Sequence, residues 1–179
     1  MLRTLLWAGG LSLAGLLGMG YWQSRTKGWL QVVAADPSPG RYRVEGPIGL
    51  VFFNGAGERL AKAALDESGV LGFEGEYAEC AEAARRPAGS AGQPSWTDCF
   101  DRLSRWIPRW GREVRAVEVT LPGCGPVRVE TRLGRSSGDW WLWWVPLPHV
   151  GGTPYSTYSL LLEVKARQCQ ARALTPAGG

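Results

Sequence analysis

The residues with the clearest potential for chemistry are four tryptophans in one short run, Trp140, Trp141, Trp143 and Trp144, which surround Leu142. Because successive side chains of a strand point to opposite faces, each face of such a strand would carry two of them. An aromatic face that stays exposed can stack against a sugar, a lipid headgroup layer or a partner protein. In the alternative that we favour, one aromatic face packs into the sandwich and a helical insertion covers the other. The run is a candidate binding surface.

His149 is the only histidine of the chain and lies in a Pro/Gly-rich loop, 145–153, directly after the tryptophans. A Ser–His or Cys–His pair would need this residue, yet no G-x-S-x-G or comparable nucleophile motif is present. The loop carboxylates Asp66, Glu67 and Asp139 leave a glycosidase-type pair open. A single histidine does not indicate a metal site. We therefore expect no catalytic residue, metal or cofactor, and we assign His149 to the candidate binding surface.

A series of arginines at helix-like steps is interleaved with Trp106 and Trp110; its members are Arg102, Arg105, Arg109, Arg112 and Arg115. Basic helices that carry tryptophan can lie on anionic membrane surfaces. However, residues 58–101 hold nine acidic and four basic residues, whereas residues 102–135 hold eight arginines and three glutamates. We favour the interpretation that these two blocks neutralise each other within the fold.

The four cysteines, Cys80, Cys99, Cys124 and Cys169, are widely spaced and include no C-x-x-C pair. An even number at this spacing favours two disulfides over a zinc site. Four cysteines allow three pairings, of which Cys80–Cys99 would staple a helical hairpin. Disulfides indicate an oxidising compartment, so we expect the domain on the periplasmic side of a cell inner membrane.

Residues 1–27 predict attachment to that membrane. Residues 5–22 form an uncharged apolar run of 18 residues, which as a helix would span roughly 27 Å. Aromatic and basic residues follow it, as in an interfacial belt. A cleaved signal peptide is the competing interpretation, with residues 5–17 as its hydrophobic stretch and residues 18–20 as the cleavage site. We favour an uncleaved transmembrane anchor.

Small residues recur every fourth position within this segment, at Gly10, Ala14 and Gly18. On a helix these three share one face, and small residues at that spacing let two helices approach closely inside lipid. Chance is the alternative, because glycine and alanine are common in such helices. The pattern predicts a membrane-protein partner or a homodimer.

Residues 28–170 are expected to form one β-rich domain, because 25 glycines and 12 prolines separate short apolar runs. Residues 75–110 interrupt this pattern with apolar positions at helical spacing and predict an inserted hairpin of helices. Residues 171–179 resemble a flexible tail. Outside residues 1–27 the chain carries 17 basic and 16 acidic residues, so its charge does not favour nucleic-acid binding.

Residues 48–73 contain an apolar strand, a Gly-rich turn, a return segment and an Asp66-x-x-Gly69 turn before a short apolar strand. This order resembles the repeating core of carboxypeptidase-regulatory-like and transthyretin-like β-sandwich modules. A threonine usually precedes the aspartate in that family, whereas Leu65 stands here. The resemblance implies a β-sandwich that serves as a binding or stalk module, with no catalytic residues to transfer.

The expected fold class is therefore mostly β: a small β-sandwich with an inserted disulfide-stapled helical hairpin, preceded by one N-terminal transmembrane helix. The expected function is that of a membrane-anchored periplasmic accessory or assembly protein of a cell-envelope complex, acting by protein–protein interaction. A glycan- or peptidoglycan-binding module, with the tryptophans as stacking platforms, is the alternative. An envelope hydrolase is a third hypothesis.

Overall fold

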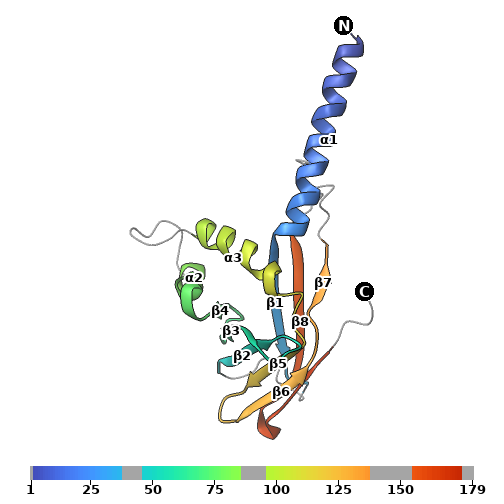
Figure 1. The fold of residues 1–179 in the computed structure, drawn as a ribbon. Coiled ribbons are helices and arrows are strands. Elements are labelled where there is room, and N and C mark those ends of the chain that lie inside the picture. Colours follow the sequence, from blue (N-terminus) through green and yellow to red (C-terminus); the bar gives the residue numbers. More distant parts are fainter. Residues whose placement is uncertain (1, 38–45, 86–95, 138–154, 175–179) are drawn as a thin grey trace.

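A long helix stands out from a mostly β domain that contains two sheets and further helices (Figure 1). The structure is a computed structural model and describes residues 2–37, 46–85, 96–137 and 155–174. The helices are α1 (Leu2–Thr26), η1 (Gly75–Tyr77), α2 (Ala78–Arg85), α3 (Trp96–Trp110) and η2 (Ala166–Gln168). The strands are β1 (Gly28–Ala35), β2 (Ile48–Phe53), β3 (Arg59–Leu65), β4 (Leu71–Phe73), β5 (Ala116–Thr120), β6 (Pro126–Glu130), β7 (Gly134–Ser136), β8 (Ser156–Lys165) and β9 (Gln170–Ala173).

The five-stranded sheet is antiparallel throughout and has the order β4-β3-β2-β5-β6. Asn54 and Asp66 form its first two turns, each with a side-chain oxygen that accepts two backbone N–H groups at 2.8–3.0 Å. Gly57 and Gly69 complete these turns at φ of +81° and +82°, a conformation that glycine adopts without steric cost. The strand–turn–strand order predicted over residues 48–73 is confirmed, and the return segment is strand β3.

The second sheet is built around β8, the longest strand. Strand β1 runs parallel to β8, with a register from Gly28↔Ser156 to Ala35↔Glu163. Strands β7 and β9 pair antiparallel with β8. Strand β1 follows α1 directly. The parallel pairing of β1 with β8 therefore fixes the C-terminal end of α1, which we call its root, next to the sheet.

Side chains from both sheets and from α3 share one hydrophobic core. The ring of Trp110 on α3 lies 5.2 Å from the ring of Phe52 and 6.2 Å from that of Phe73. Trp106 meets Phe73 edge-on at 5.1 Å. Burial of each large apolar side chain stabilises the fold by about 1.5–3 kcal/mol relative to exposure. Helix α3 is therefore an integral part of the domain's core.

The predicted helical insertion over residues 75–110 is confirmed, as are two disulfides. Cys80 on α2 is bonded to Cys99 on α3, with 5.4 Å between the Cα atoms, which is the pairing expected to staple the hairpin. Cys124 is bonded to Cys169, with 5.5 Å between the Cα atoms. This second bond joins the turn between β5 and β6 to the turn between β8 and β9.

Two sequence-based expectations differ from the structure. Residues 171–173 belong to β9 and pair with β8, so the predicted tail of residues 171–179 begins too early; backbone pairing, next to the disulfide at Cys169, orders this segment. Residues 2–26 are helical, yet within the described ranges no helix is long and apolar enough for a membrane crossing. The structure therefore gives the predicted transmembrane helix no support.

Candidate functional site: the exposed helix and the basic hollow at its base

Helix α1 presents large apolar side chains that the domain does not cover. It projects away from both sheets along most of its length (Figure 1). Leu13 is 44 % exposed, Met19 50 %, Tyr21 48 % and Trp22 60 %. Large apolar side chains that stay exposed on a projecting helix are candidates for contact with other molecules. The helix is the first component of the candidate site.

The predicted helix-packing residues lie together on this helix. Gly10, Ala14 and Gly18 are exposed, and their spacing places them on one helical face. A Cβ atom added at Gly10 or Gly18 would meet no atom within 4 Å, and the same holds for Gly15, which borders this face three residues before Gly18. Without large side chains at these positions, a second helix could approach the α1 backbone closely.

The C-terminal turn of α1 is fixed to the domain by hydrogen bonds to its main-chain carbonyls. Ser156 Oγ donates a buried hydrogen bond of 2.6 Å to Ser24 O. Arg135 Nη2 donates to Ser156 Oγ at 3.1 Å, and Arg112 Nη2 donates to Arg25 O at 3.0 Å. The last carbonyls of a helix have no partner within the helix. Side chains from β7, β8 and the end of α3 supply those partners and fix where α1 leaves the domain.

A basic hollow of about 590 Å³ lies at this junction. Its lining residues are Trp22, Gln23, Arg25, Thr26 and Lys27 from the end of α1, and Arg105, Pro108, Arg109 and Arg112 from α3 and the residues after it. Arg105, Arg109 and Arg112 follow a helical repeat and therefore share one face. Of the lining residues in the described part of the chain, five are cationic and none is acidic.

One carboxylate contacts the cations of this hollow. Asp101 accepts a hydrogen bond of 2.9 Å from Lys27 Nζ and a second one from Arg105. The Lys27 ammonium, helped by Arg105, holds the pKa of Asp101 below its ordinary value. No carboxylate of the described residues lies within ion-pair distance of Arg25, Arg109 or Arg112. Among the described residues, these three guanidinium groups therefore have no ion-pair partner.

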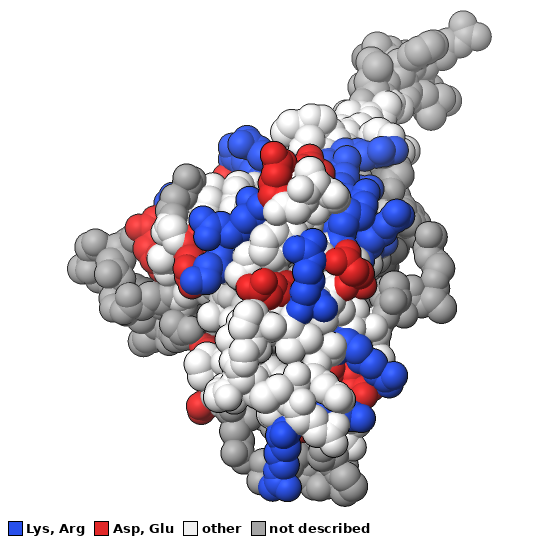
Figure 2. Space-filling view, turned by 60° about the horizontal axis from the view of Figure 1, so that its bottom comes forward, with Lys and Arg blue, Asp and Glu red and all other residues white. Residues whose placement is uncertain are grey.

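The surrounding surface is mixed in charge. On the face seen in Figure 2, basic side chains are interspersed with acidic ones over much of the domain. Arg102 pairs with Glu79 at 2.7 Å, and Arg128 pairs with Glu130 at 3.0 Å. The predicted neutralisation is confirmed for Arg102 and for Arg105, but among the described residues it does not extend to Arg109 or Arg112.

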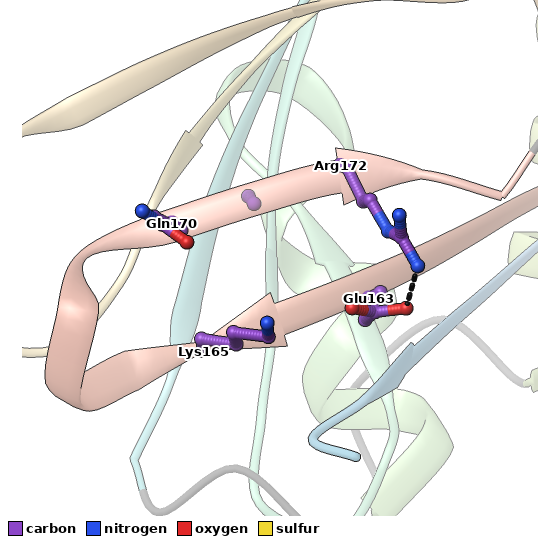
Figure 3. A pocket seen from close by; sticks show the side chains of 5 residues that line it. Glu163, Lys165, Gln170 and Arg172 are labelled. Carbon is purple, nitrogen blue, oxygen red and sulfur yellow. Dashed lines mark hydrogen bonds and ion pairs between the residues drawn. The ribbon is translucent and has the colours of Figure 1, made fainter. Parts of the chain in front are cut away.

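A second hollow, of about 320 Å³, lies over β8 and β9. The charged side chains from the two strands point toward one another across it (Figure 3). Glu163 and Arg172 form an ion pair of 2.6 Å, with Lys165 and Gln170 beside them. Because Glu163 and Arg172 already pair with each other, this hollow is a weaker candidate than the basic hollow for binding a charged ligand.

The remaining predicted site residues lie outside the described residues: Trp140, Trp141, Trp143, Trp144 and His149. The glycan-binding hypothesis depends on residues there, as does the part of the hydrolase hypothesis that uses His149 or Asp139, whereas Asp66 and Glu67 lie in the described turn between β3 and β4. Both hypotheses stay predictions. Within the described ranges, no group of three His, Cys, Asp or Glu side chains could hold a metal ion.

The basic hollow was not predicted from the sequence. The helical repeat of Arg105, Arg109 and Arg112 was visible, as were Arg25 and Lys27 after the apolar segment. What the sequence does not reveal is that α3 ends against the root of α1, because that contact depends on packing between distant segments.

Comparisons with protein-family models, with curated proteins and with solved structures found no match. The resemblance of residues 48–73 to carboxypeptidase-regulatory-like modules therefore stays a prediction. The protein is defined by its own architecture: a disulfide-braced, mostly β domain with an exposed N-terminal helix.

Proposed function

We propose that this protein is a periplasmic accessory or assembly protein of a cell-envelope complex at the inner membrane, and that it acts by binding a partner through α1. One observation carries the proposal: α1 leaves the domain with a face of small residues open and with large apolar side chains exposed beside it. The partner element that fits this surface is an apolar helix.

The energetics of α1 favour such an association. Apolar surface removed from water contributes about 25 cal/mol per Å², so burial of the exposed side chains that flank the small-residue face, such as Leu13 and Trp22, would stabilise the complex with a covering helix. Gly10 and Gly18 would allow the two backbones to come close, which increases van der Waals contact along the interface. The fixed root at Ser24 would reduce the ordering cost of binding, because α1 leaves the domain in a set direction.

The disulfides support the proposed compartment. All four cysteines are paired in two bonds. Structural disulfides form and persist in oxidising environments such as the periplasm, and they are rare in the cytosol. The two disulfides therefore support a location of the domain on the periplasmic side, where an envelope complex would meet it.

Purification of tagged full-length protein in mild detergent tests this function. The protein is isolated from its native membranes, and whatever co-elutes near stoichiometry is quantified. Gly10→Leu and Gly18→Leu should each lower the recovery of the partner by about tenfold, which corresponds to about 1.4 kcal/mol.

Ser12→Leu is the control, because it adds a leucine at an exposed position that lies two residues from Ala14 and therefore on the opposite face of α1. Its recovery of the partner should equal that of the native chain. Equal recovery from all three variants would contradict the proposal, as would elution of the native protein without any partner. Co-elution of a second copy of the chain alone would replace the partner with a homodimer.

A further inference from the structure

We propose that the basic hollow at the base of α1 binds the phosphate group of a small anionic ligand. The hollow gathers Arg25, Lys27, Arg105, Arg109 and Arg112 around about 590 Å³. Ligand pockets in proteins typically enclose about 300–1,000 Å³. The volume therefore fits a headgroup-sized ligand.

The arrangement of charge calls for an anion. Like charges held close together repel one another, and a partly enclosed site screens that repulsion less than bulk water does. Asp101 lies against Lys27 and Arg105 only. Within the described residues, Arg109 and Arg25 have no ion-pair partner, and the Arg25 guanidinium lies over the ring of Tyr21, 5.3 Å from its centroid. A bound anion would relieve this unfavourable cluster.

The geometry of Arg112 indicates a preorganised site. Its Nε donates to Tyr158 Oη at 3.2 Å, and its Nη2 donates to Arg25 O at 3.0 Å. These partners are neutral oxygens, so they hold the guanidinium in place without neutralising it. A cation that the fold positions in advance loses less conformational entropy when a ligand binds.

Phosphate is the anion whose chemistry fits best. Arginine presents planar, forked N–H donors that match the oxygens of a phosphate, and such charge-assisted hydrogen bonds are stronger than neutral ones. Trp22 and Pro108 add apolar surface to the wall, which suits the carbon part of a phosphate ester. Nucleic acid fits less well, because the chain beyond residue 27 has 17 basic and 16 acidic residues and so lacks the charge of a polyanion-binding domain.

The phosphate could belong to an anionic lipid headgroup or to a soluble phosphate ester, and two probes distinguish these sources. Full-length protein in dodecyl maltoside is titrated with glycerol 3-phosphate and, separately, captured on nanodiscs of phosphatidylglycerol or phosphatidylcholine. Binding to glycerol 3-phosphate and to phosphatidylglycerol, but not to phosphatidylcholine, would support a phosphate site that accepts either source. Binding to phosphatidylglycerol alone would assign the site to lipid, and binding to the ester alone would assign it to a soluble ligand.

Arg109→Gln is the decisive variant. The side chain is exposed and contributes to no ion pair in the described part of the chain, so the domain should keep its near-UV circular dichroism. Loss of one charged hydrogen-bond donor should weaken binding by about tenfold. Arg128→Gln on β6 is the control, because it removes one exposed arginine that already pairs with Glu130.

Native binding with a selective loss in Arg109→Gln would establish the site. Absence of native binding to both probes would overturn the proposal. So would an equal loss in Arg109→Gln and Arg128→Gln, because that result would mean attraction by net charge alone. None of these measurements involves the partner of α1. Absence of phosphate binding would therefore not contradict the proposed function, and absence of a partner would not contradict the phosphate site.

Discussion

Helices α1 and α3 meet at one corner of the molecule, yet they place their apolar surfaces in opposite environments. On α3, Leu103 and Ile107 are buried in the core at 4 % and 1 % exposure, and the basic residues face outward. On α1, Leu13 and Trp22 are exposed at 44 % and 60 %. The apolar surface of α3 is thus used in folding, whereas that of α1 remains available for association. Substitutions in the two helices should therefore have different consequences.

The largest loss of stability should come from the disulfide that braces the domain beneath both helices. Cys124 and Cys169 are separated by 45 residues, and closing a loop of this length stabilises a protein by about 4 kcal/mol in the chain-entropy model. The double variant Cys124→Ala/Cys169→Ala should lose about that much free energy of unfolding. Urea unfolding followed by near-UV circular dichroism measures it. A loss below about 1 kcal/mol would show that this bond does not brace the domain.

A matched pair of truncations tests the comparison itself. Ile107→Ala on α3 should cost about 2–5 kcal/mol, because it removes a buried side chain and leaves a cavity. Leu13→Ala on α1 should change the unfolding free energy by less than about 0.5 kcal/mol, because the side chain is exposed. Both variants are measured by urea unfolding in the same detergent. Similar costs for the two would mean that α1 is part of the cooperative fold.

The sequence predicts those features of the fold and the site that depend on residues close together in the chain. The turns at Asn54 and Asp66 were predictable, since side-chain-to-backbone hydrogen bonds within a few residues create them. The apolar repeat of α3 was also predictable, whereas the Cys80–Cys99 bond across a short hairpin was one of three pairings that the sequence left open. These features follow from residues close in sequence.

The features that escaped prediction are not local. Strand β1 pairs in parallel with β8 across more than a hundred residues, from Gly28 to Ser156, and β-strand patterns do not specify which strand will be the neighbour. The hollow depends on the same long-range assembly, because Arg112 reaches Arg25 only after α3 has docked beside β1. The placement of the basic side chains is therefore a consequence of the fold.

The joint between the two helices should respond to a smaller change. Ser156→Ala removes the buried hydrogen bond of 2.6 Å to Ser24 O and leaves that carbonyl with Arg135 at 3.5 Å. Loss of a buried partner should cost about 1–3 kcal/mol. Hydrogen exchange should accelerate in the peptide that spans residues 22–30, while exchange in β2 stays unchanged. Unchanged exchange at the joint would show that other contacts fix the root of α1.

The smallest effect should come from Asp101. Its pKa lies below the ordinary value because Lys27 and Arg105 favour the carboxylate, so it contributes stability above the unfolded-state pKa, and that contribution is lost as the pH falls through the lower folded-state pKa. Asp101→Asn should therefore be slightly less stable than the native chain at pH 7 and equal to it in acid. Urea unfolding at several pH values would reveal this convergence.

The same variant sharpens the inference about the hollow. Because Asp101→Asn removes the one carboxylate that contacts Lys27 and Arg105, it should raise phosphate affinity modestly, by about two- to threefold at low salt. Titration with glycerol 3-phosphate provides the measurement. A decrease in affinity would indicate that Asp101 positions the cations for the ligand.

The most direct test of the central claim is photo-crosslinking from α1 in native membranes. A photoreactive phenylalanine analogue is placed at position 14, within the small-residue face, or at position 12, which is exposed on the opposite face, and the products are separated and identified by mass spectrometry. We predict one dominant adduct, to the same protein that co-elutes with the native chain, from position 14 and a much weaker one from position 12. Equal adducts from both positions, or adducts to lipid alone, would contradict a partner helix on this face.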